Sequence, residues 1–253
     1  MWTIIILAIV IYLIVVTRTN VRLPHPGLQA TVDVLKMATL KDEHVIRMAR
    51  EYIRYTDCKN RVALPDDPHA CRLLALTDKY VAINGVNLDF KVYKTSSINA
   101  FACANGSVRV FSGLMDVMTD AELMAIIGHE LGHISNDDTI GAMRKAYMTS
   151  AARGAVSAAG GVLGKLTASH LGSIAEQYAG ARFSQGQEYA ADDFSLGFLG
   201  RNGYNPLAMA DALDKIARIS SGGGPAADDI ARLFSTHPDT AQRSARIRRN
   251  SGS

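Results

Sequence analysis

Residues 119–135 constrain this chain most, because they combine a helical pattern with three residues that can build a metal site. Within them, His129, Glu130 and His133 form the pattern H-E-x-x-H. Positions four apart lie one above the other on a helix, so both imidazoles can face a single ion. Glu130 lies beside them and is offset enough to hold a water molecule. The pattern therefore predicts a helix that carries two metal ligands and a base.

The same helix has a start signal and an apolar face. Thr119, followed three residues later by Glu122, forms a capping box that satisfies two free backbone N–H groups. Apolar residues recur at helical spacing, and these are Leu123, Ile126, Ile127, Leu131 and Ile134. We therefore expect the metal site to face a packed interior.

A second helix is expected to supply a third ligand, because catalytic zinc usually has three protein ligands and one open position. Ser184 and Gln187 form another capping box, and the helix that they start places Glu188 and Asp192 four residues apart on one face. Glu188 is the expected ligand, and Asp192 is expected to accept a hydrogen bond from a ligating histidine. Taken alone, the two carboxylates could be a solvated acidic face. Together with the first helix, they predict one Zn²⁺ per subunit, held by the two histidines and Glu188.

Four motifs resemble those of a known family and follow one another along the chain in that family's order. They are residues 128–133, Glu188 with Asp192, residues 236–243, and residues 99–102 ahead of a glycine turn. They resemble metallopeptidase family forty-eight, the family of HtpX and the CAAX prenyl proteases, and in particular its bacterial envelope subgroup of LoiP and BepA. The resemblance runs from about residue 30 to the C-terminus. It implies a zincin domain of the gluzincin type that hydrolyses peptide bonds, with Glu130 as the catalytic base.

The resemblance also implies a place for the substrate. Asn99, Ala100 and Ala102 are similar to the edge strand of related zincins, against which a peptide lies. An extended peptide can add itself to such an edge through backbone hydrogen bonds. Asn99 can also bind a peptide backbone through both of its amide groups. An ordinary buried strand is the alternative.

His237 is expected at the site only through the resemblance, since the corresponding His-Pro loop of the family comes to the metal. There its imidazole could occupy the fourth position and block water, or donate a hydrogen bond to the developing oxyanion. We expect a dual catalytic role, in which motion at the glycines of residues 222–224 switches between the two. Arg243 is expected to anchor the loop by pairing with Asp192 or a neighbouring carboxylate. A core or surface histidine is the alternative.

Strand spacing appears only in residues 86–111. Leu88, Phe90 and Val92 alternate with polar neighbours, and Asn105-Gly106 lies between two apolar runs. An Asn-Gly turn between apolar runs is a strong hairpin signal, so we expect a short antiparallel sheet ahead of the metal helix. The other patterns are helical, including residues 40–55 and residues 68–76. The expected fold is therefore α+β and mainly helical, with residues 40–253 as the catalytic domain.

The N-terminus is expected to attach the chain to a membrane. Residues 2–16 contain no charge and are apolar apart from Thr3 and Tyr12. The run is slightly shorter than the ~20 residues that cross a bilayer. It also lacks the basic N-terminal region and the Ala-x-Ala cleavage site of a cleaved signal peptide. We therefore expect residues 1–19 to form an N-terminal membrane helix or uncleaved signal, followed by a linker over residues 20–39.

Two opposing signals bear on which side of the membrane the catalytic domain lies. Arg18 and Arg22 favour the cytoplasmic face under the positive-inside rule. Cys58 and Cys71 flank a polar loop, and a disulfide between them would require an oxidising compartment; two unpaired thiols are the alternative. Cys103 is expected to be a buried, small apolar residue. We expect an extracytoplasmic domain, with the cytoplasmic face as the alternative.

The net charge of +3 gives no nucleic-acid signature. No nucleic-acid partner is therefore expected; the resemblance implies unfolded or misfolded proteins as partners, and the apolar N-terminal run implies a membrane. The expected function is that of a zinc-dependent endopeptidase that cuts unfolded or misassembled proteins in envelope quality control. The alternative is a chaperone-like protein that binds such proteins with little or no proteolysis.

Overall fold

The computed structural model describes residues 41–152, 166–222, 236–238 and 240–251. This part is mainly helical, as expected. Its helices are α3 (Asp42–Lys59), α4 (Pro68–Thr77), α5 (Ser112–Val117), α6 (Asp120–Ser135), α7 (Asp138–Ala152), α8 (Ala168–Ala179), α9 (Gln185–Arg201), α10 (Ala208–Ser221) and α12 (Thr240–Ser251). Its strands are β1 (Ala82–Ile83), β2 (Val86–Asn87), β3 (Asp89–Tyr93), β4 (Ala100–Ala102) and β5 (Ser107–Phe111).

The predicted membrane helix, the linker and most of the predicted glycine hinge lie outside the described ranges. Within those ranges, no helix has both the length and the apolar character needed to cross a bilayer.

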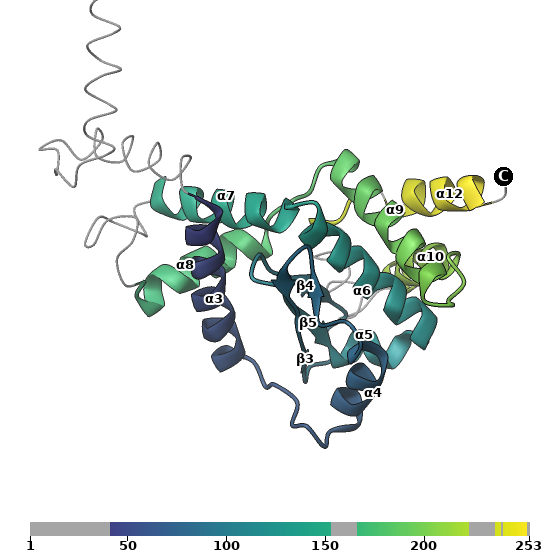
Figure 1. Cartoon of the computed structure of the whole chain (residues 1–253), viewed down its shortest axis with the longest axis horizontal. Coiled ribbons are helices and arrows are strands. Elements are labelled where there is room, and N and C mark those ends of the chain that lie inside the picture. Colours follow the sequence, from purple (N-terminus) through teal and green to yellow (C-terminus); the bar gives the residue numbers. More distant parts are fainter. Residues whose placement is uncertain (1–40, 153–165, 223–235, 239, 252–253) are drawn as a thin grey trace, which may run out of the picture.

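Helix α6 lies at the centre, with the sheet of β3, β4 and β5 on one side and α9 and α10 on the other (Figure 1). Its predicted apolar face is buried in a large cluster that joins α6 to the sheet, α9 and α10. A second cluster joins α3, α7 and α8 on the far side of the sheet, and includes Tyr52, Met143, Ile174 and Tyr178. The chain therefore has two adjoining apolar cores, with strand β4 near the boundary between them.

The helix start signals read from the sequence are present. Thr119 and Ser184 each accept a hydrogen bond from the backbone N–H three residues later, at 3.3 Å, and both capping boxes are complete. The side chain of Asp67 caps α4. These interactions join residues of one helical turn, so they do not depend on the rest of the fold.

The sheet differs from the expected one. Strands β4 and β5 form the predicted antiparallel hairpin, but β3 pairs with β5 in parallel, and the strand order is β3-β5-β4. The expectation of an antiparallel sheet was therefore wrong for β3, because alternation of apolar and polar residues does not encode strand direction. A second Asn-Gly turn, at Asn84 and Gly85, joins β1 to β2 and was missed, although its sequence signal is the same.

The cysteines are all free thiols. Cys58 and Cys71 are both exposed and unpaired, so the disulfide considered between them is not formed. Cys103 is buried as expected, and it directly follows β4.

A buried arginine joins α3 to the sheet. Arg109 on β5 is fully buried, and its guanidinium donates to Asp57 on α3 at 2.8 and 3.0 Å and to Asp89 on β3 at 2.8 Å. Burial alone would raise the pKa of Asp57, but the hydrogen bonds from Arg109 and Tyr93 lower it below its ordinary value. The paired charges fix the distance between α3 and this face of the sheet.

Two glycines of α6 allow α9 to approach closely. A Cβ atom at Gly128 would lie 2.8 Å from the ring of Phe198, and one at Gly132 would lie 2.9 Å from the Cα of Ala191. The second clash is with backbone, which cannot move aside as a side chain can. Ser195 of α9 also donates to the carbonyl of Ala125 at 2.6 Å. The absence of side chains at these glycines therefore sets the spacing of the two helices.

We expect Gly132→Ala to lower the stability of the domain by about 1–3 kcal/mol, because the added methyl group must push α6 and α9 apart. Gly141→Ala is the matched control, since Gly141 lies in helix α7 with open space around its position. The control should be neutral or slightly stabilising. Thermal unfolding of both variants measures the difference, and equal melting temperatures would contradict the packing argument.

Candidate metal centre and active site

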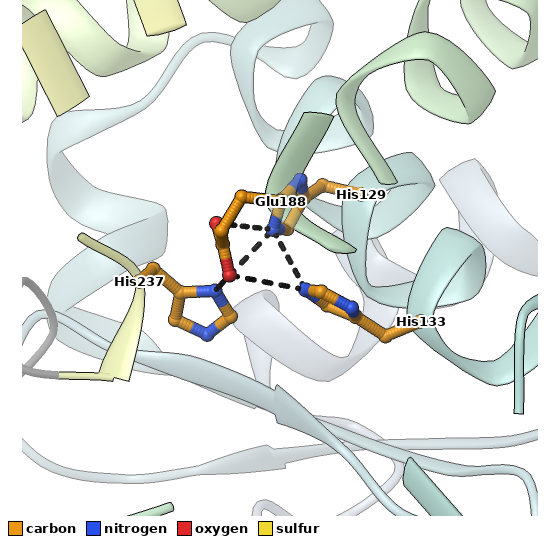
Figure 2. A group of neighbouring side chains, drawn as sticks. All are labelled: His129, His133, Glu188 and His237. Carbon is orange, nitrogen blue, oxygen red and sulfur yellow. Dashed lines mark hydrogen bonds and ion pairs between the residues drawn. The ribbon is translucent and has the colours of Figure 1, made fainter. Parts of the chain in front are cut away.

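Four side chains from three parts of the chain point toward one another (Figure 2). His129 and His133 come from α6, Glu188 comes from the first turn of α9, and His237 precedes α12. All four are buried, and one nitrogen or oxygen of each lies within 4.8 Å of those of the others. The structure therefore brings together every residue that was expected to contact the metal.

The hydrogen bonds of the two α6 histidines fix which nitrogen is free. His129 donates from Nδ1 to Asp192 at 3.0 Å, and His133 donates from Nδ1 to Asp138 at 2.9 Å, because a carboxylate accepts. A neutral imidazole that donates from Nδ1 has a lone pair on Nε2. The two Nε2 atoms face each other at 3.1 Å, so their lone pairs repel unless a positive charge lies between them.

The distances fit a tetrahedral zinc site. Zinc–ligand bonds of about 2.0–2.1 Å place the ligand atoms roughly 3.3 Å apart, because the edge of a tetrahedron is about 1.6 times its centre-to-corner distance. His129 Nε2 lies 3.1 Å from His133 Nε2 and 3.5 Å from Glu188 Oε2. His133 Nε2 lies 3.5 Å from Glu188 Oε1. These separations are close to those that a tetrahedral metal site needs, although the two histidines approach different oxygens of Glu188.

The charges at the site also favour a cation. Burial alone would raise the pKa of Glu188, but contacts with His133 and His237 hold it well below its ordinary value, so the carboxylate is ionised. Burial would lower the pKa of His133, but Asp138 and Glu188 raise it to about 9. The buried oxygen Glu188 Oε2 accepts no hydrogen bond from the described residues, but it forms an ion pair with the guanidinium of Arg243. The surroundings thus favour positive charge here, as a proton or as a metal ion.

Arg243 connects α12 to the ligands. It donates to both carboxylate oxygens of Asp192, at 2.9 and 2.7 Å, which is the pairing expected from the sequence. Its Nη1 also lies 2.5 Å from Glu188 Oε2, an ion pair whose angles are not those of a hydrogen bond. Asp192 in turn accepts a hydrogen bond from His129. Arg243, Asp192 and His129 therefore hold one another in place.

Asp138 was not identified from the sequence. It lies at the start of α7, five residues after His133, and it accepts from His133 through one oxygen and from Gln187 through the other, at 2.6 Å. Gln187 also belongs to the capping box of α9. The only sequence signal was an acidic residue one turn beyond the metal helix. Phe183 was also missed, although its ring stacks on His133 with 4.0 Å between centroids.

Glu130 lies beside the cluster and is held by the edge strand. Its Oε2 accepts from the backbone N–H of Ala102 at 2.9 Å. Its Oε1 lies 3.8 Å from His237 Nε2. The carboxylate is therefore fixed through one oxygen, while the other faces the histidine.

The outer edge of β4 faces a cavity. Hydrogen bonds to β5 involve the backbones of Asn99 and Cys103, so the backbone groups of Ala100 and Ala102 point away from β5. A cavity of about 230 Å³ lies beside these residues and reaches Glu130 and His237. Asn99 also lines it. The structure thus places the expected substrate residues next to the metal cluster.

Comparison with known proteins agrees with this geometry. The profile of peptidase family M48 matches residues 77–251. The chain is 36% identical over 222 residues to metalloprotease LoiP of Escherichia coli (strain K12), covering 87% of this chain and 86% of LoiP. It is 35% identical over 223 residues to metalloprotease YcaL of the same organism, covering 88% and 85%. A protease HtpX homolog of Salinibacter ruber is 33% identical over 189 residues, covering 61% and 64%. The chain therefore belongs to peptidase family M48 and is a metalloendopeptidase.

Proposed function

We propose that this metallopeptidase depends on zinc and cuts unfolded or misassembled proteins in quality control of the cell envelope. One observation carries the proposal: the carboxylate of Glu130 lies between the metal cluster and the edge of β4 that borders the cavity. A strand edge holds an extended chain through its backbone, largely independently of side chains. Only an unfolded segment can present its backbone in this way.

His129, His133 and Glu188 are the proposed zinc ligands, and Glu130 is the proposed base. A zinc ion held there would make water a stronger acid and polarise the carbonyl of the peptide bond. Glu130 accepts the proton of the attacking water and passes it to the leaving amine. Since Ala102 occupies Oε2 of Glu130, the free oxygen Oε1 carries this proton.

We propose that His237 blocks the metal site in the conformation described and assists catalysis after its loop moves. Its Nδ1 lies 3.3 Å from His129 Nε2 and 3.0 Å from Glu188 Oε1, which supports a place in the fourth ligand position. Its Nε2 faces Glu130, on the side from which a donor could reach the oxyanion. We propose that Asp192 orients the ligand His129 and that Arg243, by pairing with Asp192, holds α12 next to the metal site.

We also propose that residues 1–19 anchor the chain to a membrane, that residues 20–39 are a linker and that residues 40–253 are the catalytic domain. The apolar run supports the anchor. The extracytoplasmic orientation rests on the resemblance to the envelope subgroup, because the free thiols Cys58 and Cys71 do not support it. Digestion of the domain by protease added to intact spheroplasts tests this orientation, and protection of the domain would place it in the cytoplasm.

Glu130→Gln should retain its metal and lose about 10²–10⁴-fold or more of its turnover, because an amide accepts the N–H of Ala102 but cannot take up a proton. Casein digestion and zinc content measure the two effects. Glu176→Gln, the same change at an exposed position on α8, is the control. Digestion at the parental rate by the Glu130 variant would refute the assignment. If an inactive variant still prevented unfolded envelope proteins from accumulating in cells, the chaperone-like alternative would be favoured.

The blocking role of His237 predicts that His237→Ala cuts a short unstructured peptide faster than the parent does, because a blocked position opens while three metal ligands remain. His69→Ala is the control, since its ring binds Asp116 and lies on α4. Values of kcat/KM on the peptide and on a folded client decide the role. A decrease of about 10²-fold would make His237 an oxyanion donor only. Unchanged rates on both substrates would remove it from the site.

Asn99→Ala should lower kcat/KM about fivefold on peptides of unrelated sequence, because one hydrogen bond to a substrate backbone is worth about 1 kcal/mol. Asn60→Ala is matched to it, since Asn60 lines the same cavity from the end of α3 rather than from β4. Steady-state kinetics on several peptides make the comparison. If both variants match the parent, Asn99 does not bind substrate.

A further inference from the structure

Tyr178, near the end of α8, contacts the strand that holds the base. Its buried hydroxyl donates to the backbone carbonyl of Ala102 at 2.8 Å. This residue is not among the four that surround the metal position. Its contact therefore calls for an explanation other than metal binding.

Both outward-facing backbone groups of Ala102 are occupied. Its N–H donates to Glu130 at 2.9 Å, and its carbonyl accepts from Tyr178 at 2.8 Å. Ala102 is the last residue of β4, and the chain turns back toward β5 directly after it. The hydroxyl thus fixes the end of an edge strand at the residue that binds the base.

The position of the hydroxyl is itself fixed by packing. The Tyr178 ring lies in the smaller apolar core and contacts the ring of Tyr52 on α3, with 5.2 Å between centroids. A complete capping box at Thr167 starts α8. A buried ring leaves its hydroxyl few alternative positions, so Tyr178 acts as a rigid donor.

We propose that Tyr178 is a positioning residue for catalysis: it orients the backbone of Ala102 and, through Ala102, the carboxylate of Glu130. This inference rests on the proposed role of Glu130 as the base. The N–H of Ala102 donates a hydrogen bond to Glu130, so a shift of Ala102 moves the base directly. Proton transfer depends steeply on the position of the base. The contact also leaves Ala100 as the residue of β4 that can pair with a substrate.

The test compares Tyr178→Phe with Tyr52→Phe. Both changes remove one hydroxyl from the same pair of packed rings, but only Tyr178 bonds to Ala102. Tyr178→Phe should lower kcat about tenfold while KM and zinc content stay near the parental values, because the base is displaced and the ligands are not. Tyr52→Phe should keep the parental kcat. Combined with Glu130→Gln, Tyr178→Phe should cause no further loss, since it acts through the base that is already absent.

The outcomes separate this inference from the proposed function. If Glu130→Gln retains turnover, the base is wrongly assigned and the positioning role fails with it. If Glu130→Gln is inactive and Tyr178→Phe has the kcat of Tyr52→Phe, the positioning role alone is wrong. A lower KM at unchanged kcat would show that the hydroxyl obstructs substrate instead, and would also overturn the inference.

A second pair of variants covers a failure of Tyr178→Phe to fold. Para-aminophenylalanine at position 178 retains a donor, whereas para-methylphenylalanine has similar size and none. The first should restore kcat and the second should not. Equal kcat values for these two variants would refute the positioning role without reference to Tyr178→Phe.

Discussion

The packing of α6 against α9 positions the metal ligands, because His129 and His133 come from one helix and Glu188 from the other. Gly128 and Gly132 bring the helices close enough for these groups to converge. The result is two Nε2 lone pairs 3.1 Å apart beside an ionised, fully buried carboxylate. This arrangement is electrostatically unfavourable without a cation. A proton on His133, whose pKa is raised to about 9, or a metal ion supplies that positive charge.

Partners from other elements keep the ligands in this position. Asp192 and Arg243 form a buried, bidentate pair that connects α9 to α12, and Asp138 connects α7 to His133. A buried charge costs little only if it is paired and fully hydrogen-bonded, so each member needs the others. The C-terminal helix is therefore part of the site, although its arginine lies 51 positions beyond Asp192 in the chain.

The site also lies between the two apolar cores. Glu130 belongs to α6, which is buried in the larger core, and Tyr178 belongs to the smaller one. Both contact Ala102, and the neighbouring residues of β4 line the cavity. One short strand therefore positions the base and borders the space open to a peptide. The geometry of proton transfer and the place of the substrate are set together by how the two cores pack against each other.

The sequence by itself determined the elements whose signals act over one helical turn or one tight turn. These elements need only neighbouring residues, and they are present as predicted. They are the capping boxes at Thr119 and Ser184, the H-E-x-x-H helix and the hairpin at Gly106. Tertiary packing alone decided the parallel pairing of β3, the free state of Cys58 and the contact of Asp138 with His133. Strand direction and side-chain partners depend on how distant segments meet, and neither hydrophobic period nor spacing contains that information.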